Sequence, residues 1–448
     1  MVYSLTRFPL PTSATTTILV ALLLWATTAL HAQTAEQDTT IERLKRRTDF
    51  AKMYIGLDYY RTTGGTTQFM GSNGVQTATF AGTVSPRVLL GATHFWGHAD
   101  FYIAIPVSQQ QLPGNLPTGL RAMSFVEGLE SGIRVFPWAV EPGKLRPYVG
   151  ASFKGMSFAQ VGRSLNPEYS SVPSVSKTIV PLQAGLWYAR RHLLVQASVN
   201  YRNLNQLHYP LSRINYGAVS LSPWSFQIGL AYWFNTNGGM ATANGAKFMK
   251  NGPKKLAKYH RLNTWYVGIG PSVSFEMTKS DYVREKHPYL VQDSPGSFIP
   301  DLTAGRYFHK PDLNVGVSYR RLNTTTSGYG TTLRYNRRSY MLEAYKFLGD
   351  YHGFVPYIGP TLAYEDLTFT DTDGTQTQPF YARKLALGVI FGWDIRLSRS
   401  EYWLLRTNLR YTPSLHLNAN GKKVMFDQME FNFIQFVWFP GRRQALRR

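Results

Sequence analysis

The stretch SFQIGLAYWF at Ser225–Phe234 places a large apolar side chain at every second residue. A related stretch, MEFNFIQFVWF at Met429–Phe439, alternates in the same way, with Gln435 as its one break. Successive side chains of a β-strand point to opposite faces of its sheet. Both stretches therefore predict strands with one apolar face, which suits either a soluble sandwich or a barrel surrounded by lipid.

The same alternation recurs along the whole first half of the chain. Its clearest case is Leu193–Arg202, where apolar residues at odd positions alternate with mainly polar residues at even positions. Strands with this kind of pattern are predicted at residues 52–61, 86–95, 99–107, 124–136, 146–158, 178–188, 193–202 and 225–234.

The second half of the chain repeats the landmarks of the first half in the same order. The matched residues are Tyr54 with Tyr266, Glu130 with Glu343, Tyr148 with Tyr357, and Trp233 with Trp438. Four landmarks in one order are hard to obtain by chance, so the chain is interpreted as a tandem repeat. Eight further strands are therefore predicted between Thr264 and Phe439.

The connections between predicted strands alternate between short and long. Residues 96–98 and 190–192 are short connections, whereas residues 108–122, 203–223 and 277–296 are long ones. Outer-membrane barrels show this asymmetry, with short turns in the periplasm and long loops outside, which places the N-terminus in the periplasm. An aromatic belt is predicted at the periplasmic side, because most tryptophans lie near the short turns: Trp96, Trp138, Trp187, Trp233, Trp265, Trp393, Trp403 and Trp438.

Residues 1–32 have the pattern of a cleavable export signal. Arg7 precedes an apolar run at Ile18–Ala26, and Ala29, Leu30 and His31 lead up to Ala32. The alternative is a membrane anchor, but a spanning helix needs about 20 apolar residues and the run is shorter. We expect cleavage near Ala32 and a periplasmic N-terminal segment at residues 33–49.

The composition favours strands, rather than helices, as the membrane-spanning elements. No later stretch approaches 18 consecutive apolar residues, so no further spanning helix is predicted. The chain has no cysteine, which excludes a disulfide framework, a lipid-acceptor Cys and a thiol metal site. Charged residues make up 17% of the chain, below the share of about 25% that is typical of soluble proteins.

Taken together, these features resemble the Gram-negative outer-membrane β-barrel proteins, in particular the small eight-stranded class, present twice. The resemblance implies an all-β, antiparallel up-and-down transmembrane barrel of about sixteen strands in two eight-stranded halves. It also implies contact with outer-membrane lipid and lipopolysaccharide, and insertion by the barrel-assembly machinery. The two barrel repeats are expected at residues 50–234 and 264–439. One sixteen-stranded barrel also fits the strand count, but the many small inward residues favour two narrow barrels.

A basic polar tether is expected between the repeats, at residues 235–263, and a basic tail at residues 440–448. The formal charge of the chain is +22, and the dipeptide Gly252-Pro253 is expected to break any long helix in the tether. We expect the basic segments to contact anionic lipid or cell-wall polymer in the periplasm, where nucleic acid is implausible. A merely solvated tether is the alternative. The tether cations are Lys247, Lys250, Lys254, Lys255, Lys258 and Arg261.

Glu130 and Glu343 occupy matching positions that are predicted to point into the barrels. Arg134 lies four residues after Glu130, and Lys154 points inward from the neighbouring strand. Because a carboxylate buried without a partner is costly, these charges are expected to pair. We interpret the four residues as a structural plug; the alternative hypothesis is a gate for a small conductance.

The predicted external loop at residues 320–338 is strongly basic. Arginine side chains bind phosphate groups through paired hydrogen bonds. We therefore expect the loop arginines to contact the phosphates of lipopolysaccharide: Arg320, Arg321, Arg334, Arg337 and Arg338.

No catalytic, metal-binding or cofactor motif is recognised. The sequence DTDG at Asp371–Gly374 lacks the other ligands of a calcium loop and is interpreted as a polar turn. His208, His287 and His416 lie in predicted external loops without a partner at a fixed spacing. We therefore expect no enzyme activity, no cofactor and no metal.

These observations favour an integral outer-membrane protein with a non-catalytic, envelope-structural or surface-binding role. The first alternative is a single sixteen-stranded passive porin. The second is an outer-membrane lipid or peptide hydrolase that acts at the barrel rim.

Overall fold

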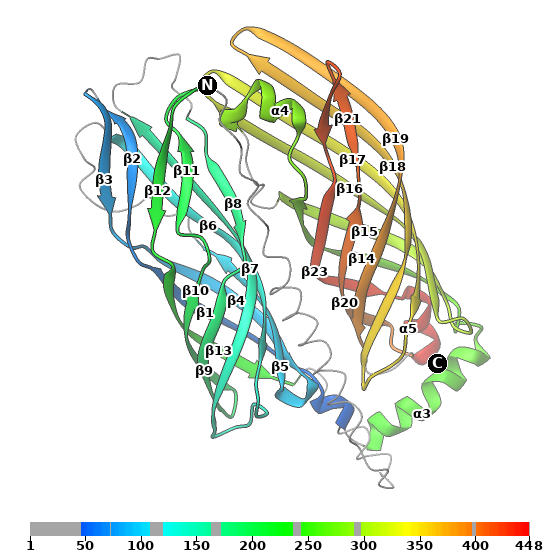
Figure 1. The fold of residues 1–448 in the computed structure, drawn as a ribbon. Helices are drawn as coiled ribbons and strands as arrows, with labels where there is room; N and C mark the ends of the chain where they lie inside the picture. Colours follow the sequence, from blue (N-terminus) through cyan, green and yellow to red (C-terminus); the bar gives the residue numbers. More distant parts are fainter. Residues whose placement is uncertain are drawn as a thin grey trace.

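The computed structural model describes residues 46–71, 73–107, 120–162, 172–235, 243–290, 297–396 and 400–447. Two β-barrels lie side by side, the first coloured blue to green and the second green to red (Figure 1). Among the described residues, no helix has the length and apolar character needed to cross a membrane. The predicted signal peptide lies outside the described residues.

Eight antiparallel strands close the first barrel. The ring closes where β1 pairs with β13 and where β6 pairs with β7. Its strands are β1 (Lys52–Thr62), β4 (Val84–His94), β5 (Ala99–Pro106), β6 (Leu120–Val135), β7 (Leu145–Gly162), β9 (Leu182–Arg190), β10 (Leu193–Tyr201) and β13 (Trp224–Phe234).

Short strands continue the first barrel beyond one end of the ring. Strands β2 (Gly65–Gly71), β3 (Gly74–Phe80), β11 (Gln206–Pro210) and β12 (Tyr216–Leu221) form a separate four-stranded sheet there. Strand β8 (Val175–Ile179) pairs with β7. The prediction of one strand at residues 178–188 is wrong, because Pro181, which has no N–H to donate, separates β8 from β9.

The second half forms a closed barrel of its own. Strand β14 pairs with β15 and β23, and not with any strand of the first half, so one sixteen-stranded cylinder is excluded. The ring consists of β14 (Thr264–Glu276), β15 (Ser297–Phe308), β16 (Leu313–Gly328), β17 (Thr331–Phe347), β18 (Phe354–Asp373), β19 (Gln376–Ile395), β20 (Trp403–Thr412) and β23 (Gln428–Trp438).

Strands β16 to β19 extend beyond this ring at the end opposite to the C-terminus (Figure 1). Strand β19 pairs with β20 only over Val389–Ile395, and its remaining length pairs with β18 alone among the described strands. Helix α4 (Asp281–Lys286), the 3-10 turn η4 (Pro288–Leu290) and the hairpin of β21 (His416–Ala419) and β22 (Lys422–Met425) pack against the extension and enclose an apolar cluster.

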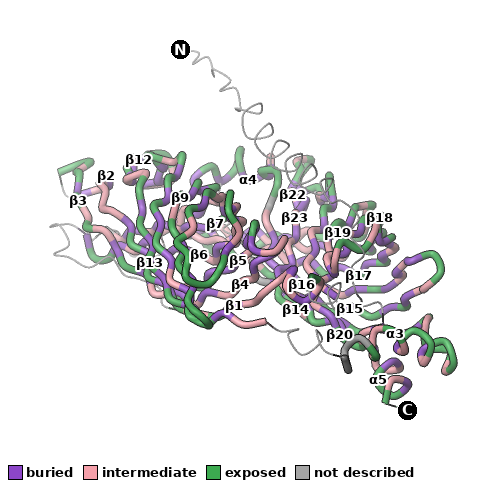
Figure 2. Tube along the Cα trace, turned by 90° about the horizontal axis from the view of Figure 1, so that it is seen from below, coloured by how far each residue is buried: buried purple, intermediate pink, exposed green. Residues whose placement is uncertain are grey.

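Apolar side chains cover the outside of both rings. In β1, Leu57 and Tyr59 are 58% and 57% exposed. Asp58 and Tyr60, which alternate with them, are buried inside the barrel. Figure 2 shows buried and exposed segments along the strands of both barrels. The predicted faces of Lys52–Thr62, Leu193–Tyr201 and Trp224–Phe234 are therefore confirmed. Large apolar groups at such positions need hydrocarbon rather than water around them.

The closing strand β23 departs from its predicted pattern through a β-bulge. Residues 432 and 436 pair with Ser272 and Ile269 of β14, so β23 contains one residue more than its neighbour in this interval. Before the bulge Phe431 points outward, and after it Val437 points inward. The prediction that these two residues share one face is wrong, and the break at Gln435 marks the place where the faces exchange.

Two tryptophans also depart from the predicted aromatic belt. Trp187 and Trp233 are buried inside the first barrel, whereas Tyr188 and Tyr232 beside them face outward. The position of a residue near the end of a strand says nothing about the face it occupies, because neighbouring residues alternate. Trp265, by contrast, is 63% exposed on the outside of the second barrel.

A helix occupies the predicted tether. Helix α3 (Ala243–Lys258) continues through Pro253, so the prediction that Gly252-Pro253 prevents a long helix is wrong. Leu256 of this helix is fully buried, and the Nζ of Lys255 donates to the backbone oxygen of Leu446 in α5 (Pro440–Arg447) at 3.2 Å. Packing against α5 therefore outweighs the weak helix propensity of this segment.

If each ring closes independently, each half of the chain should insert without the other. We expect residues 46–235 and residues 243–447, expressed separately and refolded in detergent, each to migrate faster on an unheated gel than after boiling, because every ring strand keeps both neighbours. If the full-length chain shifts on heating but neither half does, this topology is contradicted.

Candidate functional site in the barrel interiors

Glu130 lies at the centre of a buried ion-pair cluster in the first barrel. Its Oε2 lies 2.6 Å from Nη1 of Arg87 and 3.6 Å from Nζ of Lys154, and its Oε1 accepts a hydrogen bond of 2.6 Å from Tyr102. Lys154 also pairs with Glu127 at 2.9 Å. All these charged side chains are at most 5% exposed.

A bulge in β6 explains why Glu127 and Glu130 both face inward. Three residues separate them, so a regular strand would place them on opposite faces. The pairing of β6 with β7 shifts register between these two residues, which returns Glu127 to the interior. The sequence pattern gave no signal for this bulge, and Glu127 was therefore missed as a site residue.

Arg134 belongs to a second pair and not to the Glu130 cluster. Its Nη1 lies 3.0 Å from Oδ2 of Asp100, and its guanidinium lies 3.7 Å from the centre of the Tyr102 ring. Arg87 in turn binds Asp58 through two hydrogen bonds of 2.7 and 2.9 Å. The expected pairing of Glu130 with Lys154 is present, whereas a direct pair of Glu130 with Arg134 is not.

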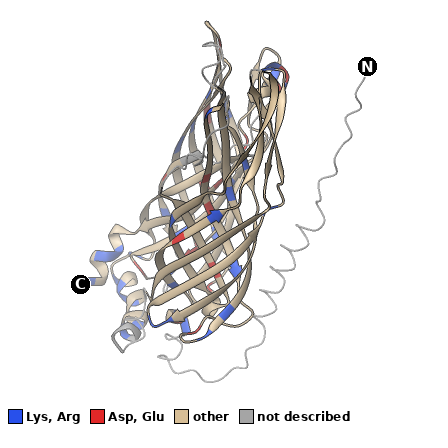
Figure 3. Cartoon of the chain, turned by 90° about the vertical axis from the view of Figure 1, so that its left-hand side faces the viewer, with Lys and Arg blue, Asp and Glu red and all other residues tan. Residues whose placement is uncertain are grey.

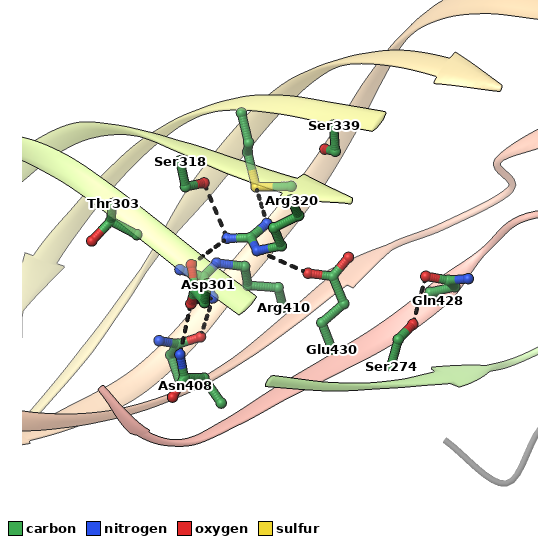
Figure 4. Close-up of polar contacts among 12 residues, drawn as sticks. Ser274, Asp301, Thr303, Ser318, Arg320, Ser339, Asn408, Arg410, Gln428 and Glu430 are labelled. Atoms are coloured by element: carbon green, nitrogen blue, oxygen red, sulfur yellow. Dashed lines mark hydrogen bonds and ion pairs between the residues drawn. The ribbon is translucent and has the colours of Figure 1, made fainter. Parts of the chain in front are cut away.

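In the second barrel, Glu343 lies between two arginines. Its Oε1 is 2.8 Å from Nε of Arg410 and 2.9 Å from Nη2 of Arg320. Figure 4 shows Arg320 between Asp301 and Glu430, with which it forms contacts of 3.5 and 3.1 Å. The cluster is 3% exposed or less and joins residues from β15, β16, β17, β20 and β23.

Arg337 extends this network. It forms two hydrogen bonds with Glu365, at 2.8 and 2.6 Å, and a third with Glu430 at 2.9 Å. The prediction that Arg320 and Arg337 contact lipopolysaccharide is therefore wrong. Residues 320–338 form most of the hairpin of β16 and β17 rather than a free loop, and every second side chain of a strand faces the interior. Arg321, Arg334 and Arg338 are exposed.

Paired charges occupy both barrel interiors. Arg87, Arg134, Arg337, Arg406 and Arg410 are among the largest fully buried side chains. Buried charges require opposite charges and hydrogen bonds beside them, and these arginines have both. The arrangement fills and fixes the interior of each barrel.

A third polar cluster lies in the extension of the second barrel. The Nε2 of His287 lies 2.9 Å from Oδ2 of Asp371, which also accepts hydrogen bonds from Tyr282 and Lys286 at 2.6 and 2.8 Å. His287, which lacked a partner in the sequence analysis, thus has one, but it is 1% exposed. His208 is exposed, and Nδ1 of His416 contacts the backbone oxygen of Ser414. Across the described residues, no three His, Asp or Glu side chains are grouped to hold a metal ion.

The interior ion pairs should make a large contribution to stability. Replacing Glu343 by Gln leaves Arg320 and Arg410 with less negative charge, and we expect a loss of about 3–5 kcal/mol in the free energy of unfolding, measured by urea titration in lipid vesicles. Glu285→Gln removes an exposed pair with Lys422 and should have a much smaller effect, because water screens that pair. Equal effects of the two substitutions would contradict the buried network.

No protein-family model and no curated protein matches this chain. Among solved structures, the neisserial surface protein A is 17% identical, with 39% of this chain and 96% of that chain covered and a TM-score of 0.27. The attachment invasion locus protein of Yersinia pestis is 12% identical, with 40% and 97% covered and a TM-score of 0.27. An outer-membrane channel from Pseudomonas putida F1 is 10% identical, with 86% and 95% covered and a TM-score of 0.21.

Because these TM-scores are low, the assignment rests on the strand pairing and the two faces of the strands. Two separately closed antiparallel rings carry apolar side chains outside and paired charges inside. The chain thus folds as two eight-stranded antiparallel β-barrels in tandem, with the apolar outer faces that a membrane-spanning barrel needs.

Proposed function

We propose that this protein is a non-conducting, non-catalytic component of the outer membrane of a Gram-negative bacterium, with an envelope-structural or surface-binding role. Export would depend on residues 1–32 and cleavage near Ala32, and insertion on the barrel-assembly machinery. The observation that carries the proposal is the buried charge network, because a water-filled pore would expose inward-facing charges to water.

The orientation follows from the two ends of the barrels. Helices α3 and α5 lie at the end where the rings begin and finish, and Figure 3 shows blue segments on the helices near the C-terminus, which mark Lys and Arg. We assign this end to the periplasm. The extension of β16–β19 then lies outside the cell and carries the surface-binding role.

The two basic surfaces suit different anionic partners. Lys247, Lys250, Lys254 and Lys258 are exposed on α3, where they are placed to bind cell-wall polymer or anionic lipid. Arg321, Arg334 and Arg338 are exposed on the outside of the β16–β17 hairpin, where they suit lipopolysaccharide phosphates. We propose no nucleic-acid partner for either surface, because both would lie outside the cytoplasm.

A hydrolase is the less favoured function. His287 has a carboxylate partner, as a catalytic histidine often does, but Tyr282 and Tyr289 enclose it and it is 1% exposed. A substrate would need access to that ring. We therefore assign His287 and Asp371 a role in holding α4 against the extension.

The closed interior predicts the absence of steady conductance. The full-length protein in a planar bilayer should show no lasting open channel, and the Glu130→Gln, Glu343→Gln double variant should behave in the same way, because neutral side chains of equal size still fill the rings. Steady conductance of the wild type would favour a pore, and a change caused by the double variant would favour a gate.

The two basic surfaces should be separable by substitution. Replacing Lys247, Lys250, Lys254 and Lys258 by Gln should reduce sedimentation with cell-wall fragments and leave lipopolysaccharide binding unchanged. Replacing Arg321, Arg334 and Arg338 by Gln should have the opposite effect, so each variant serves as the control for the other. Unchanged binding in both assays would refute both contacts.

A further inference from the structure

A cavity of about 140 Å³ lies between the two barrels. The first barrel contributes Leu90, Phe101 and Ile103 to its wall, and the second barrel contributes Leu405 and Phe433. Most of the lining is apolar, and it comes from the outer faces of the rings, which elsewhere face lipid. The wall of the cavity is therefore apolar in the same way as the lipid-facing surface.

Direct contacts between the barrels bound this cavity at both ends. On one side, Ile103 of the first barrel packs with Val273 and Phe433 of the second barrel in a buried cluster. On the periplasmic side, the ring of Phe50 lies 6.4 Å from the rings of both His352 and Phe354. The barrels touch at these places and leave an apolar space between them.

Hydrocarbon is the occupant that this environment favours. An empty apolar space deprives its walls of dispersion contacts, and an apolar cavity of about 150 Å³ is large enough to bind benzene. The space between the barrels thus has room for about six carbons of a chain. In a bilayer, the nearest source of such a chain is the surrounding lipid.

Basic and acidic side chains meet at the periplasmic end of the cavity. Arg47, Arg396 and His352 belong to its lining together with Glu401, and Arg47 pairs with Asp350 at 2.8 Å. The Nε of Arg47 is buried and has no hydrogen-bond partner, and Arg46 beside it is exposed. Burial, together with the positive charges of Arg47 and Arg46, lowers the pKa of His352. The Nε of Arg47, buried without a hydrogen-bond partner, is the donor at this end that suits an anionic group.

We propose that the cavity binds an acyl chain of one phospholipid from the periplasmic leaflet, with the lipid phosphate held at Arg46 and Arg47. The choice of leaflet rests on the orientation proposed above. Apolar walls accept the chain, and the arginines accept the phosphate. The bound lipid fills the space between two convex cylinders and joins them.

The cavity can be filled from within by a single substitution. Ala92 of β4 belongs to the lining and lies opposite Met53 of β1 in the strand register. Ala92→Phe places a ring where the acyl chain would lie. Ala197 is exposed on the outer face of β10 and is not part of the lining, so Ala197→Phe is a matched control.

The test uses the full-length protein, purified in a phospholipid-free detergent and examined by native mass spectrometry and phosphorus analysis. We expect about one phospholipid per wild-type chain, since the cavity has room for part of one acyl chain only. Retention should fall about tenfold in Ala92→Phe, a loss of about 1.4 kcal/mol in binding, and should remain unchanged in Ala197→Phe. Heat-modifiable mobility shows that each variant is folded.

A second variant tests the phosphate contact without altering the cavity. Arg46→Gln should weaken retention of the phospholipid several-fold. The proposal is overturned if the wild type retains no lipid, if Ala92→Phe retains as much as the wild type, or if the retained lipid is lipopolysaccharide. If the wild type retains no phospholipid and also shows no conductance in the planar bilayer, the lipid site is rejected and the proposed function is unaffected.

Discussion

Hydrocarbon offers no hydrogen-bond partners to the peptide backbone, and the architecture of this protein follows from that constraint. A strand in a bilayer needs a neighbour on each side, so a sheet must close. Each half of the chain meets this requirement alone, through the pairing of β1 with β13 and of β14 with β23. The segment between the halves is therefore free to form helix α3 outside the rings.

Closure with eight strands creates the second constraint, because such a narrow ring must be filled by side chains. Both barrels fill it with arginine and carboxylate pairs and with tyrosines, but they use different strands to do so. Glu130 finds its arginine on β4, whereas Glu343 finds its arginines on β16 and β20. A repeated residue thus keeps its inward position in both copies while its partners differ.

The outer faces raise a different problem where the two barrels meet. Two convex apolar surfaces touch only along a limited area, so the ion pair of Arg47 with Asp350 and the cluster around Ile103 leave a space between them. The opposite ends of the barrels are also joined, by Arg213 with Asp373 at 2.7 Å. These contacts hold the tandem barrels side by side and define the cavity that we assign to lipid.

The sequence by itself determined most of the ring strands and most of their faces, because alternation of apolar and polar residues is a local property of the chain. It therefore placed Asp58 and Glu130 inside and Leu57 outside. The bulges in β6 and β23, the helix through Pro253 and the partners of Arg134 and Arg320 were decided only by the tertiary structure. Register shifts, helix packing and ion pairs join residues that are distant in the chain, and no local pattern records which of the available neighbours each side chain meets.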